Sequence, residues 1–327
     1  MKITAIAPTR ISLFGGGTDV DPFASEYGGK VLNMAINLRH YATLIPVKKG
    51  LQSYIEAMGE SRFLDFKSRP KNDPKFDLIY EILDFYIEKL PSHFIFEDTF
   101  DGLQSAGLGS SASAAVSMIG AFNRWLGLKR TKNQIAERAW ASEIELGWVS
   151  GKQDQYASTY GGVNFFEFDK QVWNEPINKG ICDEFIEWCL LVYTGKTRHS
   201  AFLQNQLKER MKSSKETIDA LRAIRTLTWE ARDALKKADY EKVGIMLGQE
   251  WELKKKSNPA VTNERIDGFY NIALKKGALG GKILGAGGEG HMLFIVNPNK
   301  RKQVIDNLGL QEIDFSIDYN GLETRIL

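Results

Sequence analysis

The sequence predicts a two-domain protein in which both halves mix strands with helices. The chain has 327 residues, whereas one domain holds roughly 100 to 200. Its hydrophobic content of 43% is enough for a sizeable core. Strand-like and helix-like patterns occur on both sides of residues 170–186, a segment that interrupts the patterning and contains Pro176. We therefore place a domain boundary there and expect domains at residues 1–178 and 179–327.

The first half mixes predicted strands with predicted helices. Alternating, β-branched or extended stretches predict strands at residues 2–8, 10–16, parts of 31–47, 93–100 and 161–168. Apolar residues near helical spacing predict a helix at residues 77–90. A second helix is expected at residues 131–147, because Thr131 and Gln134 fit a capping box and Gly147 fits a C-terminal stop.

The second half begins with an apolar run, residues 188–195, that predicts a strand. Long helical patterns follow over residues 200–256, and another covers residues 263–276. Residues 280–296 then read as two strands around a glycine-rich turn.

Composition excludes several classes of protein. The net charge of +2 gives no field that would select nucleic acid or a membrane. Cys182 and Cys189 are too few for a disulfide framework, so we expect free thiols in a reducing cytoplasm. No apolar run has the length of a transmembrane helix, and the N-terminus lacks the apolar region of a signal peptide. The four histidines are too scattered for a zinc site.

Residues 102–120, GLQSAGLGSSASAAVSMIG, place glycines and serines directly before a helical apolar run. A helix N-terminus exposes unpaired backbone N–H groups and the positive end of the helix dipole. Glycine lets the backbone approach an anion closely, and serine hydroxyls can bind phosphate oxygens or a metal. This stretch therefore predicts a phosphate-binding loop. A serine-capped helix after a flexible loop is the alternative.

Two other glycine motifs fail the test of context. Gly195–Thr197 match the end of a P-loop, but the first glycine of that motif would fall at Leu190. The run GAGGEG at residues 285–290 fits a dinucleotide fingerprint, yet a strand-like segment follows it where that fold needs a helix. Neither a standard P-loop nor a dinucleotide fold is therefore expected.

Acidic residues downstream of the loop can complete a phosphoryl-transfer site. Asp154 lies in a segment that we expect to be a turn, where it can accept or orient the hydroxyl proton of an attacking substrate. Glu143 or Glu145, near a helix end, can help to hold Mg²⁺. Taken alone, Asp154 also fits a solvated turn carboxylate. Its combination with the loop favours the catalytic interpretation.

The N-terminal run RISLFGGGTD adds two further candidates. Asp19 can accept hydrogen bonds from two sugar hydroxyls, because a carboxylate offers only acceptors. Arg10 can offset charge that develops on a transferring phosphoryl group. The alternatives are an aspartate of a β-turn and a surface arginine.

Taken together, these segments resemble the GHMP small-molecule kinases, the family of galactokinase, homoserine kinase and mevalonate kinase. The family's loop has the form P-x-x-x-G-L-G-S-S-A-A, and residues 103–114 read LQSAGLGSSASA, with Leu103 in place of the proline. GKQDQYAS and KILGAGGEG match two further motifs of the family in the expected order. The resemblance spans almost the whole chain. It implies the α+β fold of that family, with an N-terminal ribosomal protein S5 domain 2-like domain and a C-terminal ferredoxin-like domain.

The resemblance also implies roles for residues. ATP and Mg²⁺ should bind between the two domains, with the triphosphate on Gly107, Leu108, Gly109, Ser110, Ser111 and Ala112. Ser111 and Glu143 should hold Mg²⁺, with Glu145 as the alternative to Glu143. Asp154 should be the catalytic carboxylate. Arg10, which persists from the family's pattern, should stabilise the transferring phosphoryl group.

At the substrate end, Gly16 and Gly17 replace the Glu-His pair of galactokinases, whereas Thr18 and Asp19 persist. FGGGTD, GKQDQYA and YTGKTRHS look more like the D-glycero-D-manno-heptose 7-phosphate kinases, which phosphorylate the C1 hydroxyl of a phosphorylated sugar. A second anion site would then be needed, and the candidates for it are Lys30, Lys196, Arg198 and the amides around Gly287 and Gly288.

The expected partner is therefore a small sugar phosphate, with neither nucleic acid nor membrane, and a homodimer is left open. The alternatives are another GHMP sugar 1-kinase, for fucose, galactose or a related sugar, and a catalytically silent sensor of sugar and ATP.

Overall fold

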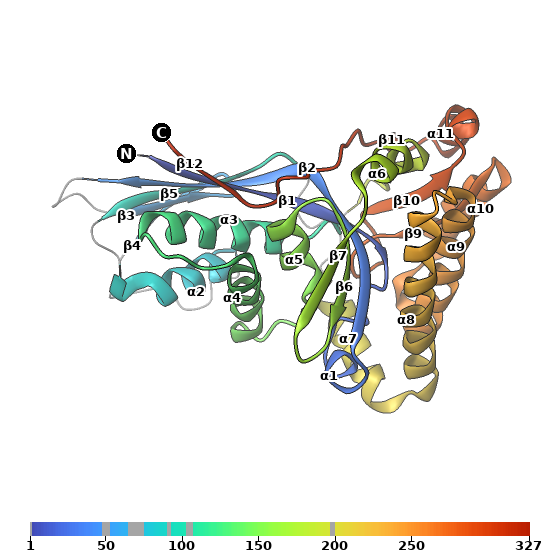
Figure 1. The fold of residues 1–327 in the computed structure, drawn as a ribbon, viewed down its shortest axis with the longest axis horizontal. Coiled ribbons are helices and arrows are strands. Elements are labelled where there is room, and N and C mark those ends of the chain that lie inside the picture. Colours follow the sequence, from blue (N-terminus) through green and yellow to red (C-terminus); the bar gives the residue numbers. More distant parts are fainter. Residues whose placement is uncertain (1, 48–52, 65–74, 90–92, 103–106, 197–199) are drawn as a thin grey trace.

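The computed structural model describes residues 2–47, 53–64, 75–89, 93–102, 107–196 and 200–327, and it contains two sheets flanked by helices (Figure 1). The first sheet has the strand order β12-β1-β2-β5-β3-β4, with β6 paired to β2 and β7 to β6. The second has the order β11-β8-β10-β9. Both halves therefore mix strands with helices, as the sequence predicts.

Two long antiparallel strands form the centre of the first sheet. They are β1 (Ile3–Phe14) and β2 (Gly29–Pro46), whose register runs from Ile3 opposite Leu44 to Phe14 opposite Leu32. The other strands are β3 (Ser53–Ala57), β4 (Glu60–Leu64), β5 (Phe94–Phe100), β6 (Val163–Phe168), β7 (Val172–Pro176) and β12 (Glu323–Ile326). The pieces that we expected within residues 31–47 are thus parts of one continuous strand.

Helices cover one face of the first sheet, below it in Figure 1. They are α2 (Asp77–Tyr86), α3 (Ser110–Trp125), α4 (Lys132–Glu145) and α5 (Gln153–Tyr160). A short helix α1 (Phe23–Tyr27) precedes β2, and a 3₁₀ turn η1 (Ile87–Lys89) follows α2. The capping box predicted at Thr131 and Gln134 is confirmed, since each side chain accepts the other residue's backbone N–H.

The second sheet consists of β8 (Cys189–Tyr193), β9 (Ala278–Ile283), β10 (His291–Val296) and β11 (Gln311–Glu312). Its helices are α6 (Lys179–Phe185), α7 (Ser200–Ser213), α8 (Lys215–Lys236), α9 (Tyr240–Ser257), α10 (Glu264–Lys275) and α11 (Arg301–Leu308), with 3₁₀ turns η2 (Ile186–Trp188), η3 (Pro259–Val261) and η4 (Pro298–Lys300). The glycine-rich run at residues 285–290 connects β9 to β10, and a strand follows it as expected.

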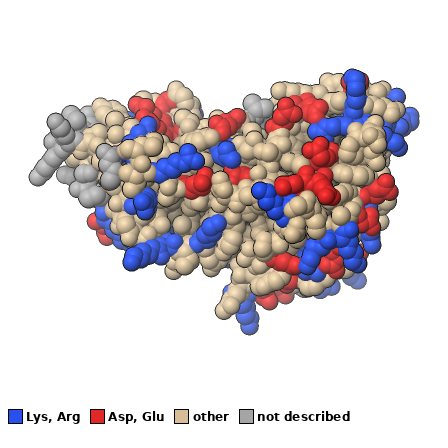
Figure 2. Space-filling model, turned by 45° about the horizontal axis from the view of Figure 1, so that its top comes forward, with Lys and Arg blue, Asp and Glu red and all other residues tan. Residues whose placement is uncertain are grey.

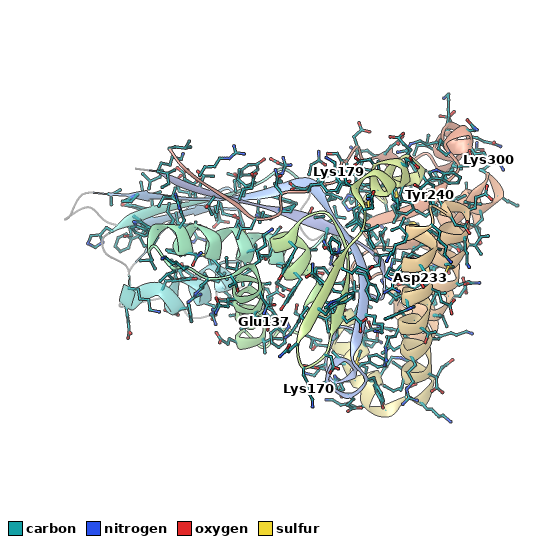
Figure 3. All side chains as sticks on the ribbon, viewed as in Figure 1. Glu137, Lys170, Lys179, Asp233, Tyr240 and Lys300 are labelled. Atoms are coloured by element: carbon teal, nitrogen blue, oxygen red, sulfur yellow. The ribbon has the colours of Figure 1, made fainter. Side chains whose placement is uncertain are left out.

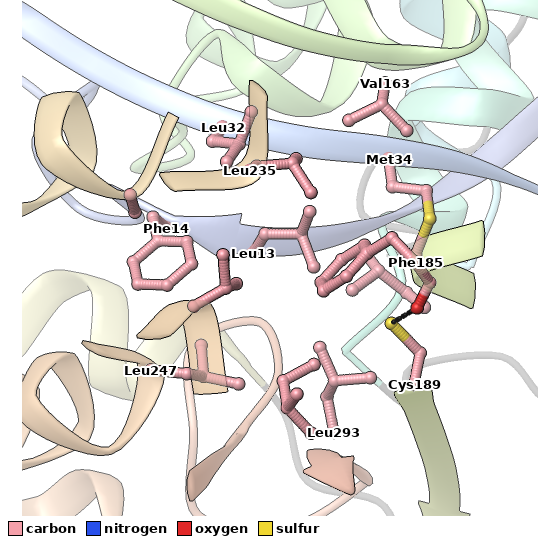
Figure 4. Close-up of a cluster of buried hydrophobic side chains, with 14 of the residues drawn as sticks. Leu13, Phe14, Leu32, Met34, Val163, Phe185, Cys189, Leu235, Leu247 and Leu293 are labelled. Atoms are coloured by element: carbon pink, nitrogen blue, oxygen red, sulfur yellow. Dashed lines mark hydrogen bonds between the residues drawn. The ribbon is translucent and has the colours of Figure 1, made fainter. Parts of the chain in front are cut away.

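One buried hydrophobic cluster joins the two halves (Figure 4). Leu13 of β1 and Leu32 of β2 lie in it together with Leu235 of α8, Leu247 of α9 and Leu293 of β10. Because this apolar surface is shared, separating the halves would expose it to water. The shared core therefore holds β1 and β2 of the first half in a fixed position relative to α8, α9 and β10 of the second half.

Two local contacts support the packing of α6. The hydroxyl of Tyr240, at the start of α9 and labelled in Figure 3, donates to the Ile181 carbonyl at 3.1 Å and to the Glu184 carboxylate at 3.0 Å. The Cys189 thiol donates to the Phe185 carbonyl at 3.5 Å (Figure 4). Cys182 and Cys189 are both buried and free, as we expected from their number.

Residues 170–186, where we placed the domain boundary, are ordered as β7 and α6, and residue 178 falls between these two elements. The C-terminal strand β12 returns to the first sheet, where it pairs antiparallel with β1, so the two chain ends lie together (Figure 1). This strand was missed because its four residues carry little apolar patterning.

Basic and acidic side chains are interspersed on the face shown in Figure 2, in keeping with the small net charge. Within the described ranges, none of the helices combines the length and hydropathy required to cross a bilayer.

Candidate active site

A cleft of about 670 Å³ lies where the two halves meet. Its walls come from β1 and the turn after it, the N-terminus of α3, the start of α5, α9 and the glycine-rich turn between β9 and β10. The three sequence motifs, far apart in the chain, therefore open onto one cavity. A concave site with convergent polar groups is the usual form of a small-molecule site.

The phosphate-binding loop has the backbone that its glycines predict. Gly107 has φ 87° and Gly109 has φ 74°, both in the left-handed region. Gly109 is the N-cap of α3 and no side chain caps the helix, so the alternative of a serine-capped helix is wrong. Ser110 and Ser111 form the first turn of α3 and line the cleft. The free amides of that turn are available to an anion.

Close packing also requires the two glycines. A Cβ at Gly107 would lie 2.8 Å from the carbonyl oxygen of Leu284, in the glycine-rich turn of the second half. A Cβ at Gly109 would lie 3.0 Å from Asp154 Oδ2. The neighbouring loop residues Leu108 and Ala112 are buried, and the Leu108 carbonyl accepts the Arg10 backbone N–H at 3.0 Å. The phosphate-binding loop therefore packs closely against both the second half of the chain and β1.

Arg10 and Asp154 form a two-point ion pair at the loop. Arg10 Nε donates to Asp154 Oδ1 at 2.7 Å, and Nη2 donates to Oδ2 at 2.5 Å. Arg10 Nη1 donates to the Gly107 carbonyl at 2.8 Å. Asp154 lies in the first turn of α5, so the expectation of an irregular turn is wrong, because the helix begins one residue earlier, at Gln153. Both side chains line the cleft, although the sequence did not indicate that they would pair with each other.

Glu143 lies beside the first turn of α3. Its Oε2 accepts from the Ser150 hydroxyl at 2.5 Å and from Gln155 Nε2 at 2.8 Å, whereas its buried Oε1 has no partner. Burial raises the pKa of Glu143 to about 7, and hydrogen bonds from Ser150 and Ser111 partly oppose that rise. An orphaned carboxylate oxygen next to a serine hydroxyl fits a hard cation.

Glu145, the alternative metal ligand, lies on the exposed side of α4. Its side chain is 55% exposed and pairs with Arg138 at 3.0 Å. The structure therefore favours Glu143 over Glu145. Within the described part of the chain, no group of three or more acidic, histidine or cysteine side chains could hold a metal ion. A Mg²⁺ ion held by Ser111 and Glu143 would need phosphate oxygens and water to complete its shell.

Asp19 occupies the cleft wall next to Asp154. Its Oδ2 accepts the Gln153 backbone N–H at 3.0 Å, and its Oδ1 accepts Gln153 Nε2 at 3.0 Å. Burial raises the pKa of Asp19 to about 6, with the backbone N–H of Gln153 opposing and the charge of Asp154 adding to the rise. A Cβ at Gly151 would collide with the Asp19 carboxylate, so this glycine is also needed.

Not every predicted substrate residue reaches the cleft. Gly16, Gly17 and Gly287 line it, but Gly288, whose N–H donates to the Val261 carbonyl at 2.7 Å, does not. The Thr18 hydroxyl donates to the carbonyls of Gly15 and Lys30, so Thr18 is a structural residue of the turn.

The prediction of a substrate role for Lys30 is corrected by its position. Its ammonium donates to Glu167 at 2.5 Å and lies 4.6 Å from the centre of the Trp229 ring, away from the cleft. β2 directs this side chain toward β6 and α8, an orientation that the local pattern did not reveal. Lys196 is exposed, and Leu103 and Arg198 lie outside the described residues.

Two lysines of the cleft were missed by sequence reasoning. Lys254 of α9 donates to the Gly285 carbonyl at 2.7 Å. Lys282 of β9 donates to Glu250 at 2.8 Å, and both partners are almost completely buried. Lys254 stands in an ordinary run of lysines at a helix end, which carried no signal. Lys282 is the first residue of KILGAGGEG, the segment that matches a motif of the family, and this was the one hint available.

The cleft continues as an apolar groove along α3. Ser111, Ala114 and Met118 line it from one flank of that helix, over about 10 Å at 1.5 Å per residue. Ile79 of α2 and Phe96 of β5 line the other side. This end suits the base and ribose of a nucleotide whose phosphates lie at the N-terminus of α3.

A glycine-lined loop at a helix N-terminus, a fixed carboxylate–guanidinium pair and an adjacent apolar groove are the features expected of a small-molecule phosphotransferase. Models of the GHMP kinases N terminal domain and of the GHMP kinases C terminal domain match residues 77–162 and 231–312. The chain belongs to the GHMP kinases, and it is an ATP-dependent phosphotransferase of the sugar kinase type.

Individual relatives agree with this assignment. The chain is 33% identical to a D-glycero-alpha-D-manno-heptose 7-phosphate kinase of Campylobacter jejuni, over 97% of both chains. It resembles the structure of a D-glycero-D-manno-heptose 1-phosphate kinase from Bacteroides thetaiotaomicron, with a TM-score of 0.80, 27% identity and 99% of both chains covered. A putative sugar kinase structure from Campylobacter jejuni has a TM-score of 0.79 and 31% identity, and covers 99% of this chain and 98% of that one.

Proposed function

We propose that this protein transfers the γ-phosphate of ATP to the anomeric C1 hydroxyl of D-glycero-D-manno-heptose 7-phosphate, giving the heptose 1,7-bisphosphate. The observation that carries the proposal is the Arg10–Asp154 pair, held against the phosphate-binding loop inside the cleft. A carboxylate in that position faces the space where a bound triphosphate and an acceptor hydroxyl would meet.

The transfer needs one proton acceptor and several donors to the phosphates. Asp154 accepts or orients the proton of the sugar hydroxyl, whose oxygen forms a bond to the γ-phosphorus as the bond to the β–γ bridging oxygen breaks. ADP leaves with that electron pair. The free amides at the start of α3 stabilise the phosphate charge, and Arg10 adds its charge beside them. Most of the rate enhancement is positioning and electrostatics.

Ser111 and Glu143 would hold Mg²⁺, because the unpartnered Oε1 of Glu143 and the neighbouring hydroxyl form an oxygen site. The ion would neutralise charge on the β- and γ-phosphates. The remaining hydrogen bonds of Glu143, from Ser150 and Gln155, keep its carboxylate oriented toward α3.

Asp19 would position the sugar. Its two oxygens accept three hydrogen bonds, from Gln153 and from the Gly17 backbone, and a carboxylate has about four acceptor sites. Gly16 and Gly17 line the cleft together with Asp19 and add no side chain of their own to it. Gln153, the residue before Asp154, donates to Asp19 from its backbone and from its side chain, so the sugar contact and the proton acceptor are held in a fixed relation.

The heptose assignment is supported by the FGGGTD segment and by two relatives above whose names contain D-glycero-D-manno-heptose or its α anomer. One is named a 7-phosphate kinase and the other a 1-phosphate kinase, so the names agree on the sugar but not on the position of the phosphate. Another sugar 1-kinase remains the second candidate, because the chain is also 29% identical to a galactokinase of Pyrococcus furiosus over 93% of its length. Asp19 and Asp154 would serve either sugar. Whether the sugar must already carry a phosphate separates the two.

An ADP-release assay over a panel of free sugars and sugar phosphates tests the proposal. We expect turnover with the heptose 7-phosphate and much lower kcat/KM for free heptose, galactose and fucose. Equal or better turnover of a free hexose would replace the heptose with that sugar. No ADP release above the buffer rate with any sugar would support the silent sensor instead.

A further inference from the structure

Lys254 is a cation of the cleft without a carboxylate of its own. It projects from the last turns of α9 and lines the cavity. Its ammonium donates to two carbonyls, Gly285 at 2.7 Å and Ile283 at 3.4 Å, and it has no ion pair among the described residues. Two neutral acceptors leave the charge of the group uncompensated and one of its three N–H bonds unused.

The charges around Lys254 make this isolation clear. Lys282 has Glu250 as its partner at 2.8 Å, and Arg10 has Asp154. The pKa of Lys254 is lowered to about 7, mainly by burial and next by the charge of Lys282; the charge of Glu250 opposes this lowering, and the charge of Arg10 adds to it. Lys254 is a third cation beside Lys282 and Arg10, which already have carboxylate partners. Its charged form is therefore costly unless an anion binds in the cleft next to it.

The position of Lys254 defines where that anion would lie. Its ammonium is bonded to Gly285, and a Cβ at Gly285 would lie 2.7 Å from the Cα of Gly107. Arg10 donates to the Gly107 carbonyl on the other side of this contact. Lys254 and Arg10 therefore flank the junction between the phosphate-binding loop and the glycine-rich turn, next to Asp154.

We propose that Lys254 binds the terminal phosphoryl group of ATP, the group that is transferred, and so is a catalytic residue contributed by the second half of the chain. This inference rests on the proposed phosphotransferase function and adds a residue to the same site. A lysine ammonium is a compact point charge that suits a phosphate whose oxygens move during the reaction. The bonds and the proton follow the transfer described above, with Lys254 donating hydrogen bonds throughout.

Nucleotide binding without any sugar gives the test. The affinity of a non-hydrolysable ATP analogue and of ADP is measured by calorimetry at fixed Mg²⁺ for the wild type, Lys254→Met and Lys256→Met. We expect Lys254→Met to weaken the triphosphate analogue about 10- to 100-fold, the range for a hydrogen bond to a charged group, and to leave ADP affinity unchanged. Lys256, exposed at the end of the same helix, serves as the matched control, and its variant should match the wild type.

Lys254→Arg provides the second variant, because it keeps the charge and should recover most of the preference for triphosphate over diphosphate. Equal losses for ADP and the analogue in Lys254→Met would overturn the proposal and make Lys254 a structural tie between α9 and the glycine-rich turn. Unchanged nucleotide affinities with a raised KM for the sugar phosphate would also overturn it, since the anion would then be the phosphate of the acceptor. Failure to phosphorylate any sugar would leave this binding result intact.

Discussion

The Arg10 guanidinium donates two hydrogen bonds, of 2.7 Å and 2.5 Å, to the Asp154 carboxylate, and these bonds join β1 to the first turn of α5. Such a two-point pair fixes the plane of the carboxylate as well as its place. Arg10 also donates to the carbonyl of Gly107, so the proton acceptor and the phosphate-binding loop share one anchor.

Replacement of Asp154 by asparagine should remove the proton acceptor while keeping the shape of the side chain. We expect kcat to fall by about 10²- to 10⁴-fold, the usual contribution of a positioned acid or base. ATP should still bind, because the loop amides are untouched. Steady-state kinetics and calorimetric titration with ATP measure the two effects. Turnover near that of the wild type would remove Asp154 from the mechanism.

Gly109→Ala should reduce kcat much more than a glycine-to-alanine change that costs the same stability elsewhere in the protein. The new Cβ would lie 3.0 Å from Asp154 Oδ2 and 3.2 Å from Arg10 Cζ, so the pair must shift. A displacement near 1 Å at a reacting group can cost about 100-fold in rate. Gly127→Ala is the matched control, because Gly127 also has a positive φ, 63°, but open space around it.

Both glycine variants should lose about 1–2 kcal/mol of stability from the left-handed backbone. Thermal unfolding and kcat are measured for both. Similar kcat values in the two variants would show that the contact with the Arg10–Asp154 pair has no catalytic consequence.

The buried pair of Lys282 and Glu250 should contribute to stability only as a pair. Both side chains are at most 2% exposed, so Lys282→Met leaves Glu250 as an uncompensated buried charge. We expect a loss of about 3–5 kcal/mol in the free energy of unfolding. Adding Glu250→Gln should recover part of this loss, because the amide oxygen can still accept the Gly15 backbone N–H.

Urea denaturation of the wild type, Lys282→Met and the double variant measures these differences. A single Lys282→Met variant as stable as the wild type would show that the buried pair adds nothing to stability.

Asp19 should make stability depend on pH in acid solution. Its pKa is raised from 3.8 to about 6 by burial, so the folded state binds a proton in a range where the unfolded state has released it. Stability should therefore fall as the pH rises from about 4 to about 6, by up to about 3 kcal/mol. The measurement is the difference in unfolding free energy between the wild type and Asp19→Asn across that range. A difference that is flat with pH would show that Asp19 titrates normally.

Local sequence patterns predicted most elements of the fold, because burial on one face imposes the strand and helix periods directly. The capping box at Thr131 and the loop glycines were also readable, since few residue types satisfy those backbone positions. The ordered connection at residues 170–186 and the return of β12 to the first sheet depend on tertiary pairing. Nothing in those short segments indicated their partners.

The candidate site was predicted where function depends on a motif and missed where it depends on packing. The positions of Arg10, Asp19, Glu143 and Asp154 around the loop followed from the motifs. Lys30 was misplaced, because any lysine on a strand can face either side of the sheet. Lys254 was missed, because in the sequence it looks like the two lysines that follow it. Only its contact with the glycine-rich turn, which depends on how α9 packs, distinguishes it.

The position of the new phosphate tests the central claim most directly. Phosphorus NMR of the product, formed from heptose 7-phosphate and ATP, should show a second phosphate coupled to the anomeric proton, with the original 7-phosphate retained. The same mixture with the Asp154→Asn variant should show only starting material over the same time. A product phosphorylated at another carbon, or ADP formed with no new sugar phosphate, would contradict the account.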